Sequence, residues 1–429
     1  MTSEPINEVY VWTWLPGEVE PVVAGLITRD GDKHIFNYGR SYLERKAAIP
    51  LYESELPLKR GALPPLDDLA MAGCLRDGAP DAWGRRVIIN RLFGKKGDDV
   101  DVGTLDELRY FIESGSDRIG ALDFQRSGAT YEPRSTDAAT LEELLSVADH
   151  VEKGVPITPE LERAVFHGTS LGGARPKAAI ETKDAKFIAK FASSSDITNV
   201  VKGEFVAMQL AAKLGLNVAE TELTRAGGKD VLLVKRFDRE KTKKGWTRKA
   251  MVSALTMLEL DEMMGRYASY QNLAEIIRAR FTAPKATLHE LYGRLVFNVL
   301  CGNTDDHARN HAAFWDGKAL TLTPAYDICP QNRTGREANQ AMLIAGEKRT
   351  STLATCLEAA PHFLLKEKEA TDLIVAQVEG IHRHWPEVAD MAGLSEIDKS
   401  TLWRRRFLNP FAFEGAPETI MALQDGWSG

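Results

Sequence analysis

The most informative segment of the chain is Asn303-Thr304-Asp305-Asp306-His307-Ala308-Arg309-Asn310, which Tyr326-Asp327-Ile328 follows downstream. Asp305 and Asn310 have the spacing Asp-x-x-x-x-Asn. A carboxylate can orient and deprotonate a hydroxyl group, and an amide oxygen together with a second carboxylate, here Asp327, can hold Mg²⁺. One such pair means little by itself, because Asp and Asn are also common in turns. The segments that precede it decide its interpretation.

The segment 168–174 is rich in glycine and small hydroxyl residues, and it leads into a β-hairpin expected over 177–191. Lys190 lies near the end of the second strand, and Glu204 follows at the start of an expected amphipathic helix. Protein kinases place a phosphate-binding loop, a strand lysine, a helix glutamate and a catalytic loop in this order. The glycine-rich segment is neither Gly-x-Gly-x-x-Gly nor a Walker A motif, so it is a weak indicator when taken alone.

Hydrophobic patterning predicts strands at the front of the chain and helices towards its end. Runs of β-branched and aromatic residues, separated by glycine, proline and other turn residues, indicate a mixed β region near the start. Beyond residue 250 the pattern is mainly helical. The expected strands lie at 9–14, 22–27, 34–38 and 231–234, and the expected helices lie near 81–89, 141–145, 204–214 and 288–300.

A chain of 429 residues suggests two or three packed units rather than one core. Hydrophobic residues make up 44% and charged residues 27%, which is typical of a globular protein. The formal net charge of -7 argues against non-specific coating of nucleic acid. Four separated cysteines favour neither a disulfide framework nor a thiolate metal site. Because the sequence shows no signal peptide and no membrane span, we expect a cytoplasmic protein without membrane contact.

Four segments in this order are specific when taken together: Ser170-Leu171-Gly172-Gly173-Ala174-Arg175-Pro176-Lys177, Val234-Lys235-Arg236-Phe237-Asp238-Arg239, Gly302-Asn303-Thr304-Asp305-Asp306-His307-Ala308-Arg309-Asn310 and Leu322-Thr323-Pro324-Ala325-Tyr326-Asp327. They resemble the HipA family, the serine/threonine kinase toxins of bacterial type II toxin–antitoxin systems. The segment Leu75-Arg76-Asp77-Gly78-Ala79-Pro80-Asp81-Ala82-Trp83-Gly84-Arg85-Arg86 is similar to part of that family's N-terminal domain. The resemblance covers residues 5–390.

This resemblance implies an α+β, two-lobed, protein-kinase-like (HipA) fold with an N-terminal mixed β subdomain and a mainly helical C-terminal lobe. The N-terminal subdomain is expected at residues 1–125. A nucleotide-binding lobe with the glycine-rich loop and the hinge is expected at 126–239. The helical lobe, with the catalytic loop and the metal site, is expected at 240–429.

The resemblance also implies a role for individual residues. Asp305 would be the catalytic base, and Asn310 and Asp327 would be the Mg²⁺ ligands. Ser170 falls on the loop serine that family members autophosphorylate, which ejects the loop and disables ATP binding. The residues expected to bind the nucleotide are Lys177, Lys190, Gly172, Gly173, Ala174 and Phe237, the last at the adenine hinge.

Three neighbouring residues are expected to play lesser parts. His307 would support the catalytic loop through hydrogen bonds, and Glu204 would steady the strand lysine. Asp306 stands where a glycine is common in the family. Its extra carboxylate could perturb metal binding, but we expect it to face solvent.

The resemblance implies a toxin that transfers the γ-phosphate of ATP to a protein hydroxyl, with ATP and Mg²⁺ as cofactors. The expected substrate is a protein, by family habit an aminoacyl-tRNA synthetase, whose modification inhibits translation and growth. A helix-turn-helix DNA-binding antitoxin (HipB-like) is the expected partner, so DNA would be contacted only indirectly. Two alternatives remain open: a kinase of small molecules or lipids, and a catalytically silent co-repressor that binds the antitoxin. The intact set of Asp305, Asn310, Asp327 and Lys190 speaks against the silent module.

Overall fold

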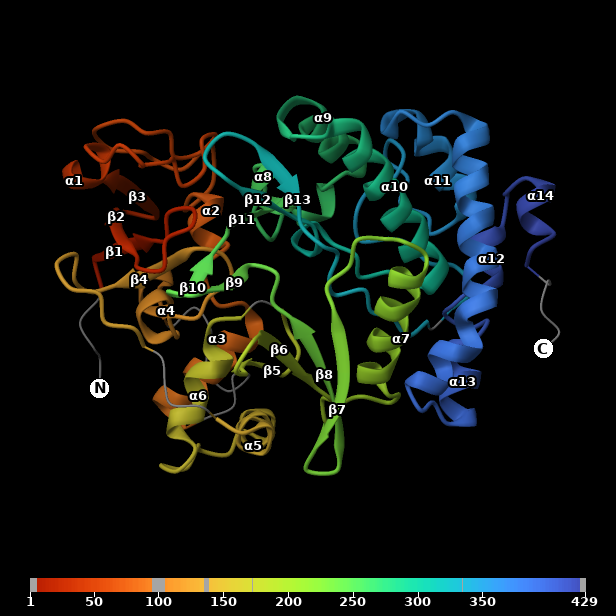
Figure 1. Ribbon diagram of the computed structural model, residues 1–429, viewed down its shortest axis with the longest axis horizontal. Helices are drawn as coiled ribbons and strands as arrows, with labels where there is room; N and C mark the ends of the chain where they lie inside the picture. The colour runs from red at the N-terminus through yellow and green to blue at the C-terminus, as the bar shows by residue number, and fades with distance from the viewer. Residues whose placement is uncertain (1–5, 95–104, 135–138, 172, 334, 425–429) are drawn as a thin grey trace. The chain divides into compact units, whose positions relative to one another are not determined.

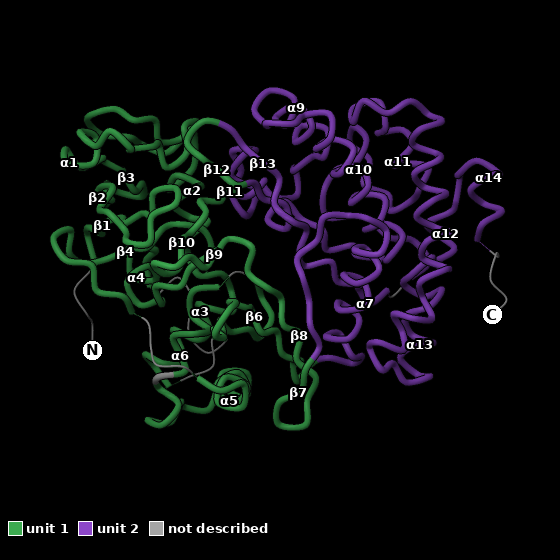
Figure 2. The backbone as a smooth tube through the Cα atoms, viewed as in Figure 1, with its two compact units in different colours: residues 1–195, 224–252, 314–318 green, residues 196–223, 253–313, 319–429 purple. Residues whose placement is uncertain are grey.

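The computed structural model describes residues 6–94, 105–134, 139–171, 173–333 and 335–424. The chain forms two compact units, each assembled from segments far apart in the sequence (Figure 2). Unit 1 contains residues 1–195, 224–252 and 314–318, and unit 2 contains residues 196–223, 253–313 and 319–429. Within the described ranges, no helix is both long and apolar enough to cross a membrane.

The front of unit 1 is an antiparallel sheet in the order β3-β2-β1-β4. Its strands are β1 (Glu8–Thr13), β2 (Val22–Asp30), β3 (Lys33–Tyr38) and β4 (Leu122–Gln125). The first three confirm the expected strands, because alternate residues such as Val9, Val11 and Phe36 are fully buried. Strand β4 was not expected from the sequence. Short helices α1 (Arg40–Leu43), α2 (Gly73–Arg76) and α4 (Glu107–Glu113) complete this part.

The second sheet has the order β5-β6-β8-β7 and begins with the expected hairpin. Its strands are β5 (Lys177–Glu181), β6 (Lys186–Phe191), β7 (Thr221–Ala226) and β8 (Lys229–Lys235). Three helices pack on this sheet around Trp83, Phe191 and Val231: α3 (Ala82–Phe93), α5 (Leu141–Lys153) and α6 (Glu162–Thr169) (Figure 1). Helix α6 corrects one expectation, because Gly168 and Thr169 form its last turn instead of belonging to the loop.

In the described residues, five further strands follow β8. Three of them lie at or beyond residue 250, where the chain is otherwise mainly helical, as the sequence pattern predicted. Strands β9 (Arg239–Thr242) and β10 (Gly245–Arg248) form a hairpin. Strands β11 (Ala250–Ser253), β12 (Ala312–Trp315) and β13 (Leu320–Leu322) form a small sheet in that order.

Unit 2 is mainly helical, and α10 (Pro284–Cys301) lies at its centre. Proline at the first helical position starts this helix favourably, and every residue from 291 to 301 is buried. The other elements are α7 (Val200–Lys213), α8 (Ala254–Met257), α9 (Tyr270–Arg280), α11 (Leu353–Ala359), α12 (Glu367–Met391), α13 (Glu396–Leu402), α14 (Glu418–Met421) and the 3₁₀ turns η3 (Gly265–Tyr267), η4 (Ala308–Asn310), η5 (Ala360–Phe363) and η6 (Pro410–Phe413) (Figure 1). The α+β character expected from the sequence is confirmed, whereas the boundaries at residues 125 and 239 stay a prediction.

Candidate active site

The catalytic-loop segment starts at the end of α10, where Gly302 adopts a left-handed conformation with φ of 72°. A Cβ at this position would lie 3.0 Å from the backbone oxygen of Arg406, so both the conformation and the space favour glycine. Asn303 then folds back on the helix. Its Nδ2 donates to Oδ1 of Asn298 (3.0 Å), and its backbone nitrogen donates to the Asn298 carbonyl (2.9 Å). The loop therefore begins at a fixed point of the buried helix.

Asp306 connects the loop to the interior of unit 2. It is also the clearest correction to the sequence analysis. It was expected to face solvent, but it is only 2% exposed. Its carboxylate lies 3.0 Å from Nε2 of His311 and accepts a hydrogen bond from the hydroxyl of Tyr270. Burial opposes ionisation, yet the interactions with His311 and Tyr270 outweigh it and lower the pKa of Asp306. The carboxylate thus serves to hold the loop in place.

The three predicted site residues of unit 2 lie on this loop and on a segment hydrogen-bonded to it. Asp305 is exposed, while Asn310 is buried and its Nδ2 donates to the backbone carbonyl of Asp305 (3.3 Å). The segment of Asp327 is tied to the loop because the hydroxyl of Tyr326 donates to the carbonyl of Arg309 (2.7 Å). Asp327 itself has a φ of 60°, a left-handed conformation that is uncommon for residues other than glycine, although aspartate adopts it more readily than most.

The electrostatic environment of Asp305 includes the carboxylates of Asp327 and Asp306. Partial desolvation by the surrounding loop raises the pKa of Asp305, and the negative charges of Asp327 and Asp306 raise it further, while His307 lowers it. A divalent cation between such carboxylates would relieve their repulsion. Because Nδ2 of Asn310 is occupied by the Asp305 carbonyl, its side-chain oxygen is the atom available for a ligand role.

The side-chain oxygens of Asn310 and Asp327 suit Mg²⁺ better than they suit a metal whose ligands all come from the protein. In the described parts of the chain, no group of three or more His, Cys, Asp or Glu side chains is placed to hold a metal ion. Mg²⁺ typically takes one or two carboxylates from the protein and completes its shell with water and phosphate oxygens. An aspartate and an asparagine in the positions of Asp327 and Asn310 match that habit.

His307 shapes the loop through its backbone, since its carbonyl accepts from the backbone nitrogen of Asn310 (2.8 Å). Its side chain is exposed and acts on Asp305 by charge. The neighbouring Arg309 forms an ion pair with Glu262 (2.9 Å). The supporting role predicted for His307 stays a prediction.

The predicted phosphate-binding residues lie in unit 1. Lys177 and Lys190 are direct partners in the antiparallel register of β5 and β6, so their side chains share one face of the sheet. Lys177 is also only 6% exposed. The nucleotide-binding role predicted for the two lysines stays a prediction.

The glycine-rich segment lies against the start of β5. Gly173 has a φ of 94°, and a Cβ on it would collide with Nζ of Lys177, which places that ammonium group against the loop backbone. Ser170 is 3% exposed, and its Oγ donates to the carbonyl of Asp117 (3.3 Å). Ala174 is exposed. Gly172, also predicted to line the nucleotide site, lies outside the described residues.

The segment around Phe237 is held by a buried charge network that the sequence analysis missed. The ring of Phe237 makes an edge-on contact with Phe314 at 5.9 Å between centroids. On either side of it, Arg236 and Arg239 both lie near the carboxylate of Asp117, at 3.2 and 3.0 Å, and both contact Asp238. Burial opposes the charge of Asp238, but Arg236 and Arg239 lower its pKa to about 2.

Glu204, predicted to steady the strand lysine, lies in α7 of unit 2 and is 3% exposed. An unpaired carboxylate is rarely buried to this degree, so the burial indicates a polar partner. Its role toward Lys190 stays a prediction.

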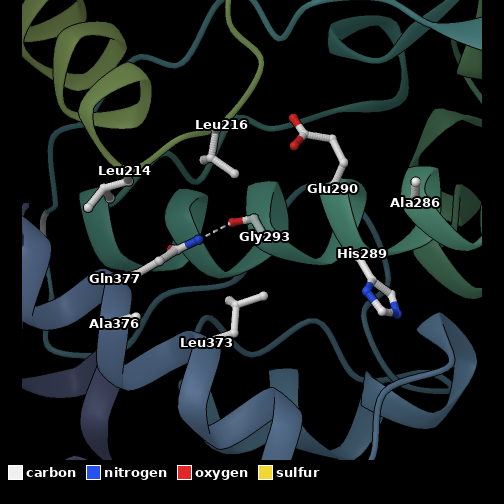
Figure 3. A pocket seen from close by; sticks show the side chains of 9 residues that line it. All are labelled: Leu214, Leu216, Ala286, His289, Glu290, Gly293, Leu373, Ala376 and Gln377. Carbon is white, nitrogen blue, oxygen red and sulfur yellow. Dashed lines mark hydrogen bonds between the residues drawn. The ribbon is translucent and has the colours of Figure 1, made fainter.

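Unit 2 also contains a cavity of about 460 Å³ between α10 and α12 (Figure 3). Leu214, Leu216 and Leu373 form much of its apolar wall. Gln377 points across it, and its Nε2 donates to the carbonyl of Gly293 (2.9 Å). None of the residues predicted for the active site lines this cavity.

Comparison with known families decides the identity of this arrangement. A sequence profile of the HipA-like C-terminal domain matches residues 169–385, just over half of the chain. The chain belongs to the HipA family. A profile of the HipA N-terminal domain also matches, at residues 18–125. The resemblance stated from the motifs is therefore confirmed.

Individual relatives of this HipA-family chain are distant. A hypothetical kinase of Sinorhizobium fredii is 27% identical over 180 residues, which cover 37% of this chain and 41% of the relative. The serine/threonine-protein kinase toxin HipA of Shewanella oneidensis is 26% identical over 183 residues, which cover 37% of this chain and 42% of the relative. The matched region thus spans less than half the length of these curated relatives.

The likeness to a solved HipA structure extends over nearly the whole chain. A chain in the complex of Shewanella oneidensis HipA, HipB and operator DNA matches with a TM-score of 0.65 and 19% identity, covering 97% of both chains. At this identity the match shows the fold. It confirms the expected kinase-like HipA fold, and the roles of single residues remain predictions.

Proposed function

We propose that this HipA-family protein is an ATP- and Mg²⁺-dependent serine/threonine protein kinase that acts as a toxin. The observation that supports it most is that Asp305 and Asn310 lie on a loop held by the buried Asp306, and that the segment of Asp327 is hydrogen-bonded to this loop. Family membership and the names of the relatives point to the same chemistry. The match to each named relative covers only part of it, so the activity of the whole protein is our proposal.

Asp305 is suited to accept the proton of an attacking hydroxyl. Burial raises the pKa of its carboxyl group, which makes it a stronger base than an ordinary aspartate. Asn310 and Asp327 would hold Mg²⁺, which on binding would neutralise charge on the transferring phosphate. Lys177 and Lys190 would bind phosphate oxygens from the sheet.

We propose a protein substrate, by family habit an aminoacyl-tRNA synthetase, whose modification would inhibit translation. We also propose a helix-turn-helix antitoxin as partner, with DNA contacted only through it. The solved relative, in complex with HipB and operator DNA, supports this assembly for the family. The net charge of -7 agrees with a protein that leaves DNA contacts to its partner.

Self-inactivation through Ser170 is part of the proposal. A phosphate on Ser170 would add about -1.5 to -2 charges. Because Ser170 is buried and bonded to the Asp117 carbonyl, the side chain has to leave this position before it can be modified. The modified loop would then be unable to return to the same place.

The proposal is tested by incubating the protein with γ-labelled ATP and a bacterial lysate. Label in a protein band supports it, whereas label in a lipid or small-molecule fraction would assign another substrate class. Asp305→Ala should abolish transfer, since a general base contributes about 10²–10⁴-fold. Glu347→Ala, which changes an exposed carboxylate of the same unit, should transfer label like the wild type. Absence of label everywhere would favour a silent co-repressor.

A further inference from the structure

The segment from residue 75 to 86 contributed to the family resemblance without receiving a role. In the structure its last part starts α3, and Asp81 occupies the N-cap position. Aspartate at an N-cap normally accepts a hydrogen bond from its own helix. Asp81 makes no such bond. Its Oδ2 instead accepts from the backbone nitrogen of Gly173 in the glycine-rich segment (2.7 Å).

The first turn of α3 also bonds to the carbonyl group of Gly173. The backbone nitrogen of Trp83 donates to the carbonyl of Gly173 (3.1 Å), so both polar backbone groups of the glycine are bonded to one helix start. The guanidinium of Arg86 donates to the carbonyl of Ala174. The indole Nε1 of Trp83 donates to the carbonyl of Lys177 (2.9 Å).

The contact continues to the beginning of the segment. Gly84 packs so closely that a Cβ there would lie 2.6 Å from the carbonyl oxygen of Thr169. The start of α3 therefore contacts the glycine-rich segment at its beginning, at Gly173 and at its junction with β5. Gly173 needs its left-handed φ of 94° to make these bonds, and in that conformation it lies against Nζ of Lys177.

We propose that Asp81 is a positioning residue for phosphate binding. It holds Gly173, and through it the glycine-rich segment, in the conformation that keeps the Lys177 ammonium ready for the phosphates of a nucleotide. The bond from the Gly173 amide to the Asp81 side chain is short, and a hydrogen bond to a carboxylate is stronger than one to a neutral oxygen. The inference rests on the proposed function, because it assumes that a nucleotide phosphate binds beside Lys177.

Two measurements on the full chain test this role: hydrogen exchange of segment 171–176 without nucleotide, and calorimetric binding of Mg²⁺-ATP and of adenosine. Loss of a charge-assisted hydrogen bond should speed loop exchange about tenfold in Asp81→Ala and weaken Mg²⁺-ATP binding by a similar factor. Adenosine has no phosphates, so its affinity should not change. Asp81→Asn keeps an acceptor oxygen, so its loop exchange rate and its Mg²⁺-ATP affinity should lie between those of the wild type and those of Asp81→Ala. Asp68→Ala, an exposed change in the same unit, should match the wild type.

Wild-type exchange and affinity in Asp81→Ala would overturn the inference. Equal losses for Mg²⁺-ATP and adenosine would also overturn it, since they would indicate general damage to the fold. Tighter Mg²⁺-ATP binding would mean that Asp81 competes with phosphate instead of preparing its site. Failure of the proposed function looks different: the wild type itself would not bind Mg²⁺-ATP, whatever the exchange of the loop.

Discussion

Replacing Asp306 tests whether the catalytic loop depends on its buried anchor. In Asp306→Ala, His311 and the hydroxyl of Tyr270 lose a charged partner in a buried site. Two buried donors that lose their acceptor cost about 1–3 kcal/mol each. At about 2–4 °C per kcal/mol for a cooperative unit of this size, the melting temperature should fall by on the order of 10 °C. Asp306→Asn keeps the shape and one acceptor, so it should cost about 1–3 kcal/mol.

The pH dependence gives the sharper assay. The pKa of Asp306 is lower in the folded protein than its ordinary value of 3.8, so its ionisation stabilises the fold above that value. This contribution is lost as the pH falls through the lower, folded-state pKa. In urea unfolding, the difference between wild type and Asp306→Asn should therefore be constant near neutral pH and shrink below about pH 4. Glu347→Ala provides the surface control.

Two results would refute this reasoning. One is a folded Asp306→Ala protein whose stability lies within about 0.5 kcal/mol of the wild type, the range of ordinary surface substitutions. The other is a difference between wild type and Asp306→Asn that does not change between pH 7 and pH 3.

Three further outcomes are expected. Asp327→Asn should weaken Mg²⁺-ATP binding more than adenosine binding, because Asp327 would act through the metal; equal losses by calorimetry would contradict that role. Gly302→Ala should lower the free energy of unfolding in urea by at least about 1–2 kcal/mol, because alanine is strained in the left-handed conformation and Arg406 leaves little room. Gly346→Ala, with open space around it, should show the backbone cost alone. Ser170→Ala should keep ATP affinity, while wild-type protein phosphorylated at Ser170, identified by mass spectrometry, should bind ATP more weakly; unchanged affinity of the phosphorylated form would exclude self-inactivation by this route.

Local sequence patterns predicted those helices and strands whose position depends on residues close together in the chain. The helix before the catalytic loop was expected because apolar residues recur throughout 288–300. The hairpin of β5 and β6 was expected from two short runs on either side of the polar turn 182–185. Asp305, Asn310 and Asp327 were named from the Asp-x-x-x-x-Asn spacing together with the family resemblance, and their roles stay predictions.

What the sequence could not predict depends on partners that are distant along the chain. Asp306 looked like a surface carboxylate, and only Tyr270 and His311 make its burial possible. Asp81 lies at the start of the helix expected near residues 81–89, yet its partner Gly173 comes 92 residues later. In both positions the residue type suits a local role, so local patterns gave no sign of the long-range contact.

The charge network of unit 1 has a consequence for how this chain can vary in evolution. Arg236 and Arg239 donate to the carbonyls of Arg118 and Gly120, and Asp238 accepts from the Gly120 nitrogen (2.8 Å). Exchange of the front segment for one without a carboxylate at position 117 would remove an anionic partner of the buried Arg236 and Arg239 guanidinium groups, at a cost of several kcal/mol. The front of the chain and the segment after β8 should therefore be inherited together, and recombination between them should be selected against.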